Sequence, residues 1–213
     1  MTVTEQLSAT GIIPVIRLDD PDDARPLGEA LLAGGVNTAE ITFRAAGADR
    51  AIRLMSEHYP EILVGAGTVL KTDQVSLAAD SGARFIVSPG FNPKTAHAAI
   101  IQDLPVYPGV CTPTEIEAAM EYGLTTLKFF PAGAFGGVKT LKALSGPYGM
   151  VKFIPTGGVS LSNLAEYVSC PATACVGGTY IATAEFIRNR DWQQITELCR
   201  KSLEIISECR QTK

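Results

Sequence analysis

The sequence predicts an α/β fold in which eight parallel strands alternate with helices, a (β/α)8 or TIM barrel. Eight short apolar runs, most of them bounded by Gly or Pro, begin near Gly11, Asn37, Leu63, Phe85, Val106, Thr126, Phe153 and Ala174. Their starts are about 20–27 residues apart, which leaves room for a strand, a helix and two short loops in each unit. Nearly continuous apolar strands are typical of parallel sheets covered on both faces. The alternative is an open doubly wound sheet, which has the same alternation of elements.

Helix signals lie between the apolar runs. The acidic stretch from Asp20 to Asp23 precedes a predicted helix that ends at Gly34 and Gly35, since acids favour a helix start and glycine favours its end. The segment from Thr112 to Glu115 has the pattern of a capping box with proline at the first helical position, and Gly123 follows that helix.

Both ends of the chain add a helix to the predicted barrel. The residues before Gly11 are long enough for a short helix, and a longer one is expected from Asp191 onward. The second helix places one set of side chains on a single face: Trp192, Ile195, Leu198, Ser202, Ile205 and Cys209. No linker or change of composition interrupts the chain, so we expect one domain over residues 1–213.

Composition and charge exclude several classes of protein. The net charge of −4 and the lack of a basic cluster argue against a nucleic-acid partner. The longest uncharged run, residues 167–184, contains Pro171, Gly177 and Gly178, so we expect no membrane span. The histidines His58 and His97 lie in helix-like stretches without ligand-spaced neighbours, so we expect no metal site.

The cysteines and the N-terminal residues predict a cytoplasmic protein. Five cysteines are an odd number and contain no Cys-x-x-Cys pair, which favours reduced thiols. The first residues, Met1 to Glu5, lack the charged and then apolar layout of a signal peptide.

Lys128 is the first candidate for chemistry, because it interrupts the apolar run from Thr126 to Pro131. Burial disfavours the charged form of a lysine, and a neutral amine is a nucleophile towards ketones and aldehydes. The alternative is that Lys128 lies at a strand end and extends its ammonium group to water.

Polar side chains also alternate in the second predicted strand. Glu40, Thr42 and Arg44 share one face, separated by Ile41 and Phe43. In a closed barrel this face is the lumen, where a carboxylate near a lysine can transfer protons and an arginine can bind a carboxylate or phosphate. The edge strand of an open sheet would show the same alternation.

Three glycine-rich turns follow predicted strands. The segment from Gly65 to Thr68 lacks the third glycine of a dinucleotide fingerprint, which leaves two interpretations: close approach of backbone to a ligand, or tight packing. Gly157 and Gly158 follow the seventh strand, and Gly177, Gly178 and Thr179 follow the eighth. Barrels frequently bind phosphate with these two loops, although plain tight turns give the same pattern.

Six segments resemble the 2-keto-3-deoxy-6-phosphogluconate (KDPG) and 4-hydroxy-2-oxoglutarate (KHG) aldolases, a class I family of the Entner–Doudoroff pathway. They occur in unbroken order: Ala39–Arg44, Val64–Leu70, Val87–Gly90, Leu127–Ala132, Pro155–Val159 and Gly177–Gly178. The resemblance implies a homotrimer of (β/α)8 barrels that needs no metal or other cofactor and acts on a phosphorylated 2-keto acid sugar.

The resemblance also implies roles for individual residues. Lys128 matches the Schiff-base lysine and Glu40 the general acid/base. The substrate site matches Arg44 and Thr68 for the pyruvate carboxylate, with Pro89 and Phe130 lining the pocket. The phosphate site matches Gly157, Gly158, Gly178 and Thr179, where the family usually has serine at the last position.

Two further residues bear on specificity. Arg17, at the end of the first strand, is present in some relatives, and the sequence does not decide whether Arg17 or Arg44 holds the carboxylate. Thr156 resembles the phosphogluconate branch of the family more than the galactonate branch. The expected reaction is cleavage of KDPG to pyruvate and D-glyceraldehyde 3-phosphate. The alternatives are KHG cleavage, the galactonate epimer, oxaloacetate decarboxylation, or a non-covalent phosphosugar-binding barrel.

Overall fold

Parallel strands alternate with helices throughout the computed structural model, which describes residues 1–211. The strands are β1 (Ile12–Ile16), β2 (Thr38–Thr42), β3 (Leu63–Gly67), β4 (Ile86–Val87), β5 (Val106–Tyr107), β6 (Gly109–Val110), β7 (Thr126–Phe129), β8 (Lys152–Pro155) and β9 (Val176–Gly178). Each of the eight apolar runs in the sequence contains at least one of these strands. Pro108 divides the fifth run into β5 and β6, since proline has no N–H to donate to a strand ladder.

The strands close into a barrel. One sheet has the order β5-β4-β3-β2-β1-β9, and a second has the order β6-β7-β8. Parallel bridges from Phe153 to Thr173 and from Thr156 to Gly177 join the β8 region to the β9 region. Because β5 and β6 are consecutive in the chain, the ring has no open edge. The (β/α)8 prediction is confirmed, and the open sheet is excluded.

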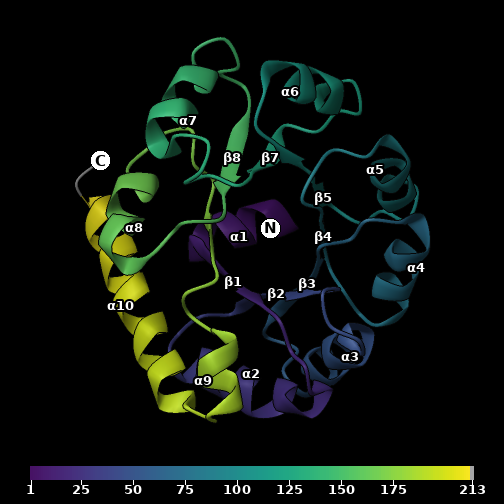
Figure 1. The fold of residues 1–213 in the computed structure, drawn as a ribbon, viewed down its shortest axis with the longest axis vertical. Helices are drawn as coiled ribbons and strands as arrows, with labels where there is room; N and C mark the ends of the chain where they lie inside the picture. The colour runs from purple at the N-terminus through teal and green to yellow at the C-terminus, as the bar shows by residue number, and fades with distance from the viewer. Residues whose placement is uncertain (212–213) are drawn as a thin grey trace.

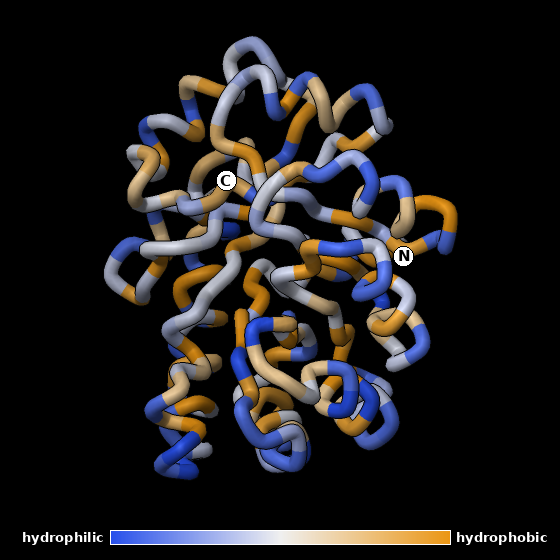
Figure 2. The backbone as a smooth tube through the Cα atoms, turned by 45° about the vertical axis from the view of Figure 1, so that its right-hand side comes forward, coloured by the Kyte–Doolittle hydropathy of each residue, from blue (hydrophilic) through white to orange (hydrophobic). Residues whose placement is uncertain are grey.

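Helices surround this ring, except for α1, which lies across its centre in the view of Figure 1. The helices are α1 (Val3–Thr10), α2 (Ala24–Ala33), α3 (Ala48–His58), α4 (Thr72–Asp80), α5 (Pro93–Ile100), α6 (Pro113–Met120), α7 (Gly137–Ser145), α8 (Leu161–Val168), α9 (Ala184–Arg188) and α10 (Trp192–Gln211). Figure 2 shows hydrophobic and hydrophilic residues alternating along the outer helices, as expected for helices with one face on the strands. Within residues 1–211, no helix is both long and apolar enough to cross a bilayer.

The helix boundaries follow the capping signals closely. The predicted capping box of α6 is present: Glu115 N–H donates to Thr112 Oγ1, and Thr112 N–H donates to Glu115 Oε2. The acidic stretch before α2 forms a separate 3-10 turn over Pro21–Asp23, and Gly35, with φ of 84°, supplies the left-handed residue after the helix. In α10 the buried face includes Ile206, which is 2% exposed, where the sequence pattern placed Ile205.

The first helix, α1, closes the end of the barrel at which the strands begin. Its Leu7 is 1% exposed and belongs to an apolar cluster of inward-facing residues: Ile13, Leu63, Phe85, Val87, Tyr107, Ile154 and Cys175. The Tyr107 hydroxyl shares a hydrogen bond of 2.8 Å with Thr4 Oγ1 of the same helix. Burial raises the pKa of Tyr107 to about 12, so this phenol stays neutral and holds α1 without adding charge to the core.

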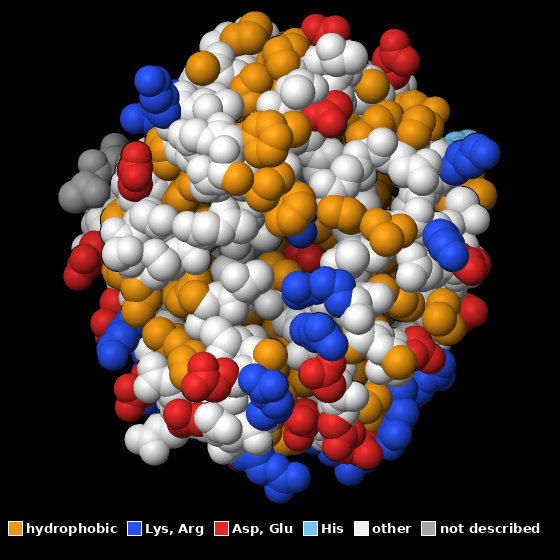
Figure 3. Space-filling view, in the orientation of Figure 1, with side chains coloured by type: hydrophobic (Ala, Val, Ile, Leu, Met, Phe, Trp, Pro, Cys, Tyr) orange, Lys and Arg blue, Asp and Glu red, His pale blue; other side chains and the backbone are white. Residues whose placement is uncertain are grey.

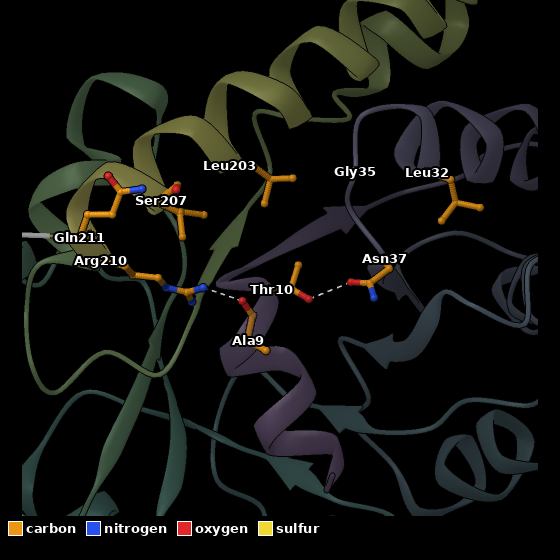
Figure 4. Close-up of a pocket in the computed structure, with 10 residues that line it drawn as sticks. Ala9, Thr10, Leu32, Gly35, Asn37, Leu203, Ser207, Arg210 and Gln211 are labelled. Atoms are coloured by element: carbon orange, nitrogen blue, oxygen red, sulfur yellow. Dashed lines mark hydrogen bonds between the residues drawn. The ribbon is translucent and has the colours of Figure 1, made fainter.

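The C-terminal helix fixes α1 from outside. Figure 4 shows Arg210 of α10 reaching the end of α1, where its guanidinium donates to the carbonyl oxygens of Ser8 and Ala9. These carbonyls lie in the last turn of a helix, where a cation is favourable. Beside this contact is a hollow of about 700 Å³, lined by Thr10, Asn37 and Leu203 among others. It lies at the amino-terminal end of the strands, away from Lys128.

We expect Leu7→Ala to destabilise the protein by about 2–5 kcal/mol, because it opens a cavity in the floor of the barrel. Chemical denaturation measures the loss. The matched control is Leu77→Ala on α4, where leucine is 42% exposed and the expected change is about 0.5 kcal/mol or less. Equal effects of the two substitutions would show that α1 is not part of the core.

Candidate active site

A cavity of about 170 Å³ opens at the carboxyl ends of the strands. Its lining brings together most of the predicted site: Glu40, Arg44, Thr68, Pro89, Lys128, Phe130, Thr156, Gly157 and Thr179, together with Val15. Figure 3 shows basic side chains gathered beside a hollow near the centre of one face of the molecule. The site is therefore built by residues from strands that are far apart in the sequence, as barrel sites are.

Lys128 and Glu40 form a buried ion pair in this cavity. The distance from Lys128 Nζ to Glu40 Oε1 is 3.4 Å, and the side chains are only 6% and 3% exposed. The Phe130 ring lies 5.3 Å from Nζ, within the range of a cation–π contact. The interpretation of Lys128 as a strand-end lysine that reaches water is wrong, because the ammonium group remains inside the barrel.

Only part of the burial of Lys128 comes from its neighbours in sequence. Phe130 lies beside Nζ in the cavity, whereas Leu127 and Phe129 point outward and pack in the cluster between strands and helices, since side chains alternate along a strand. Further apolar surroundings come from the inward-facing cluster described above, which includes Phe85 and Ile154. Lys152, on the neighbouring strand β8, is exposed, and its Nζ donates to Pro171 O.

The residues expected to bind a carboxylate line the mouth of the cavity. Arg44 is exposed just beyond β2, and its Nε donates to Thr42 Oγ1 at 3.2 Å. The Thr42 hydroxyl is itself 2.8 Å from Ile16 O on β1, so the hydrogen bond from Arg44 is tied to two strands. Thr68 has φ of 55°, a left-handed conformation that β-branched residues rarely adopt and that is concentrated at functional sites.

Arg17 lies apart from this group. Its Nε is 2.9 Å from Asp19 Oδ1 in an ion pair whose side chains are 51% and 57% exposed. Arg17 does not line the cavity, whereas Arg44 does. The structure therefore separates the two arginines that the sequence could not rank.

The two glycine turns lie on the side of the cavity opposite β3. Gly157 and Gly158 have φ of 90° and 79°, so both need glycine, and Gly157 lines the cavity with Thr156 and Thr179. Gly158 and Gly178 adjoin these residues in sequence without lining the cavity themselves. The Asn163 amide, at the start of α8, donates to Gly158 O at 2.9 Å and fixes this turn.

The structure adds features that the sequence reading missed. Val15 lines the cavity opposite Glu40 in the β1–β2 register, and inward alternation along the first strand was the available signal. The open choice at Gly65 and Gly67 is decided for tight packing: a Cβ on Gly65 would lie 2.2 Å from the Phe85 ring, and one on Gly67 would lie 2.2 Å from Glu40.

Comparisons with known proteins place these observations in a family. The family model for KDPG and KHG aldolase matches residues 3–198. The chain belongs to this family. A Haemophilus influenzae protein, 2-dehydro-3-deoxy-phosphogluconate aldolase, is 44% identical over 96% of each chain. The KHG/KDPG aldolase of Escherichia coli is 40% identical, over 95% of this chain and 96% of the relative.

A solved structure supports the same assignment. The KDPG aldolase of Legionella pneumophila is 42% identical and superimposes with a TM-score of 0.90, covering 93% of this chain and 97% of the other. That protein was crystallised with pyruvate captured at low pH as a covalent carbinolamine intermediate. Within residues 1–211, no group of three or more His, Cys, Asp or Glu side chains is arranged to hold a metal ion.

We expect Lys128→Met to destabilise the fold by about 3–5 kcal/mol, because it leaves the Glu40 carboxylate buried without a counter-ion. Urea denaturation at neutral pH measures this loss. The matched control is Lys152→Met, an exposed lysine on the adjoining strand, with an expected change of about 0.5 kcal/mol or less. Replacing both members of the pair, with Glu40→Gln and Lys128→Met together, should restore part of the stability. Equal losses in the two single lysine variants would contradict a buried pair.

Proposed function

We propose that this chain is a class I aldolase that reversibly cleaves KDPG to pyruvate and D-glyceraldehyde 3-phosphate, with Lys128 as the imine-forming amine. The observation that carries the proposal is the buried amine of Lys128, 3.4 Å from a single carboxylate in a cavity open at the carboxyl ends of the strands. Family membership and the carbinolamine trapped in the Legionella relative support the same chemistry.

Glu40 is placed to activate the lysine. A protonated amine has no lone pair, so Lys128 must lose a proton before it attacks a ketone. Glu40 Oε1 is the carboxylate oxygen within 3.4 Å of Nζ, and transfer of one proton turns two buried charges into two neutral groups.

The cleavage then follows from the imine. Lys128 Nζ adds to the C2 ketone to give a carbinolamine. The carbinolamine hydroxyl then takes the proton held by Glu40 and leaves as water, which gives an iminium ion and returns Glu40 to its carboxylate form. The iminium draws the electron pair of the C3–C4 bond, while Glu40, directly or through a water, takes the proton of the C4 hydroxyl and the aldehyde leaves. The remaining enamine is protonated at C3, and addition of water to the iminium releases pyruvate and the free lysine.

The rest of the cavity supplies binding energy for positioning. Arg44 uses Nε to bind Thr42, which leaves its terminal nitrogens for the substrate carboxylate near Thr68. Pro89 and Phe130 line the cavity beside the reacting carbons. At the other side, Gly157, Gly158, Gly178 and Thr179 bind the phosphate, because backbone without side chains lets N–H groups approach an anion. Such remote binding energy can orient the reacting atoms.

Two further expectations, the oligomeric state and the location in the cell, belong to this proposal. The homotrimer implied by the family resemblance stays a prediction, and contacts between copies would cover apolar side chains that this chain exposes, such as Ile101 and Met150 at 66% and 60%. A cytoplasmic location is consistent with the five cysteines, which form no disulfide with one another within the described residues.

Incubation with pyruvate and borohydride tests the chemistry directly. We expect mass spectrometry to find one reduced pyruvate adduct, which peptide mapping places on Lys128. Lys128→Met should remove the adduct and all detectable turnover, whereas Lys152→Met should keep both. A folded protein that binds pyruvate but forms no adduct would favour a non-covalent phosphosugar-binding barrel instead.

Cleavage of KHG is a second candidate activity, favoured by the name of the Escherichia coli relative. KDPG carries a phosphate, whereas KHG is a shorter dicarboxylate without one, so Thr179→Ala separates them. We expect kcat/KM for KDPG to fall about tenfold or more, as for loss of one hydrogen bond to a charged group, while kcat/KM for KHG changes less than about twofold. Equal losses on both substrates would mean that Thr179 acts through the fold and not through phosphate.

A further inference from the structure

Beyond Leu63, towards its carboxyl end, strand β3 has no side chain that faces the lumen. Its inward positions are Gly65 and Gly67, whereas Val64 and Ala66 face the helices. A Cβ on Gly67 would lie 2.2 Å from Oε1, 2.6 Å from Cγ and 2.7 Å from Cδ of Glu40. Ordinary contacts between carbon atoms are about 3.5–4.0 Å. The carboxyl group of Glu40 therefore occupies the space that any side chain at position 67 would need.

The backbone of Gly67 gives no other reason for glycine. It does not lie in the left-handed region, in contrast to Gly157 with φ of 90°. The three nearest atoms to the missing Cβ all belong to Glu40, so Glu40 is the closest obstacle to a side chain at position 67. In the ladder, Gly67 pairs with Thr42 and Glu40 pairs with Gly65, so the Glu40 side chain leans along the neighbouring strand towards the cavity mouth.

We propose that Gly67 is a positioning residue: its missing side chain lets the Glu40 carboxylate rest against β3, within proton-transfer distance of Lys128. This inference rests on the proposed function of Glu40 as the general acid/base. An alanine at position 67 would push the carboxylate away by about 1 Å or more to reach normal contact. Displacements of about 1 Å at a reacting group can reduce rates about a hundredfold.

The first experiment measures steady-state kinetics of Gly67→Ala with KDPG. We expect kcat to fall about 10–100-fold and KM to change less than about threefold, because Arg44 and the phosphate turns are untouched. The control is Gly149→Ala, since no atom lies within 4 Å of a Cβ there and its φ is not positive, and its kcat should stay within about twofold. An unchanged kcat in Gly67→Ala would overturn the proposal.

A double-mutant cycle with Glu40→Ala shows whether Gly67 acts through Glu40. Gly67→Ala should lower the urea midpoint of the wild-type protein, and it should leave the midpoint of Glu40→Ala unchanged, because the obstructing side chain is gone. If Gly67→Ala alone does not fold, recovery of folding in the double variant supports the same conclusion. Equal harm in both backgrounds would overturn it.

The cycle separates this inference from the proposed function. The urea midpoints need no activity, so they test the steric relation between Gly67 and Glu40 even in an inactive protein. The pyruvate adduct on Lys128 in the wild-type protein tests the imine chemistry and does not depend on position 67. The wild-type protein could form the adduct while Gly67→Ala lowers the urea midpoint equally with and without Glu40. That result would retain the aldolase assignment and reject the role of Gly67.

Discussion

An ion pair enclosed in an apolar barrel is the interaction on which the site depends. Removing two charges from water is costly, and Lys128 and Glu40 recover part of that cost through each other at 3.4 Å, with the Phe130 ring beside the ammonium group. In the proposed mechanism, Glu40 both holds the amine in place and accepts its proton.

The floor of the barrel provides the apolar surroundings of the ion pair. Below the ion pair, Phe85, Tyr107 and Ile154 fill the lumen, and Leu7 of α1 closes it from the amino-terminal end. Arg210 then binds the end of α1 from the C-terminal helix, so both ends of the chain support the same floor. The cavity that holds the ion pair opens at the other end of the barrel, at the carboxyl ends of the strands.

The sequence predicts the parts of this design that depend on local pattern, and fails where distant strands meet. Strand spacing gives the barrel, and a lysine in an apolar strand marks the site. The apolar run around Lys128 accounts for only part of its burial, however: Phe130 lines the cavity, but Leu127 and Phe129 face the helices, and other strands fill the lumen below. Nor does any local signal show that the missing side chain of Gly67 leaves room for Glu40, since that contact joins two strands that are separated in the sequence.

The two arginines show the same limit of prediction from sequence, because only the structure shows how their surroundings differ. Arg44 is tied to the barrel through Thr42 and lines the cavity, which suits a group that holds a carboxylate at a fixed distance from Lys128. Arg17 is paired only with the exposed Asp19. Exposed pairs contribute about 0.2–1 kcal/mol, so an incoming anion can displace Asp19 at little cost. These different surroundings support the proposal that Arg44, and not Arg17, contacts the carboxylate.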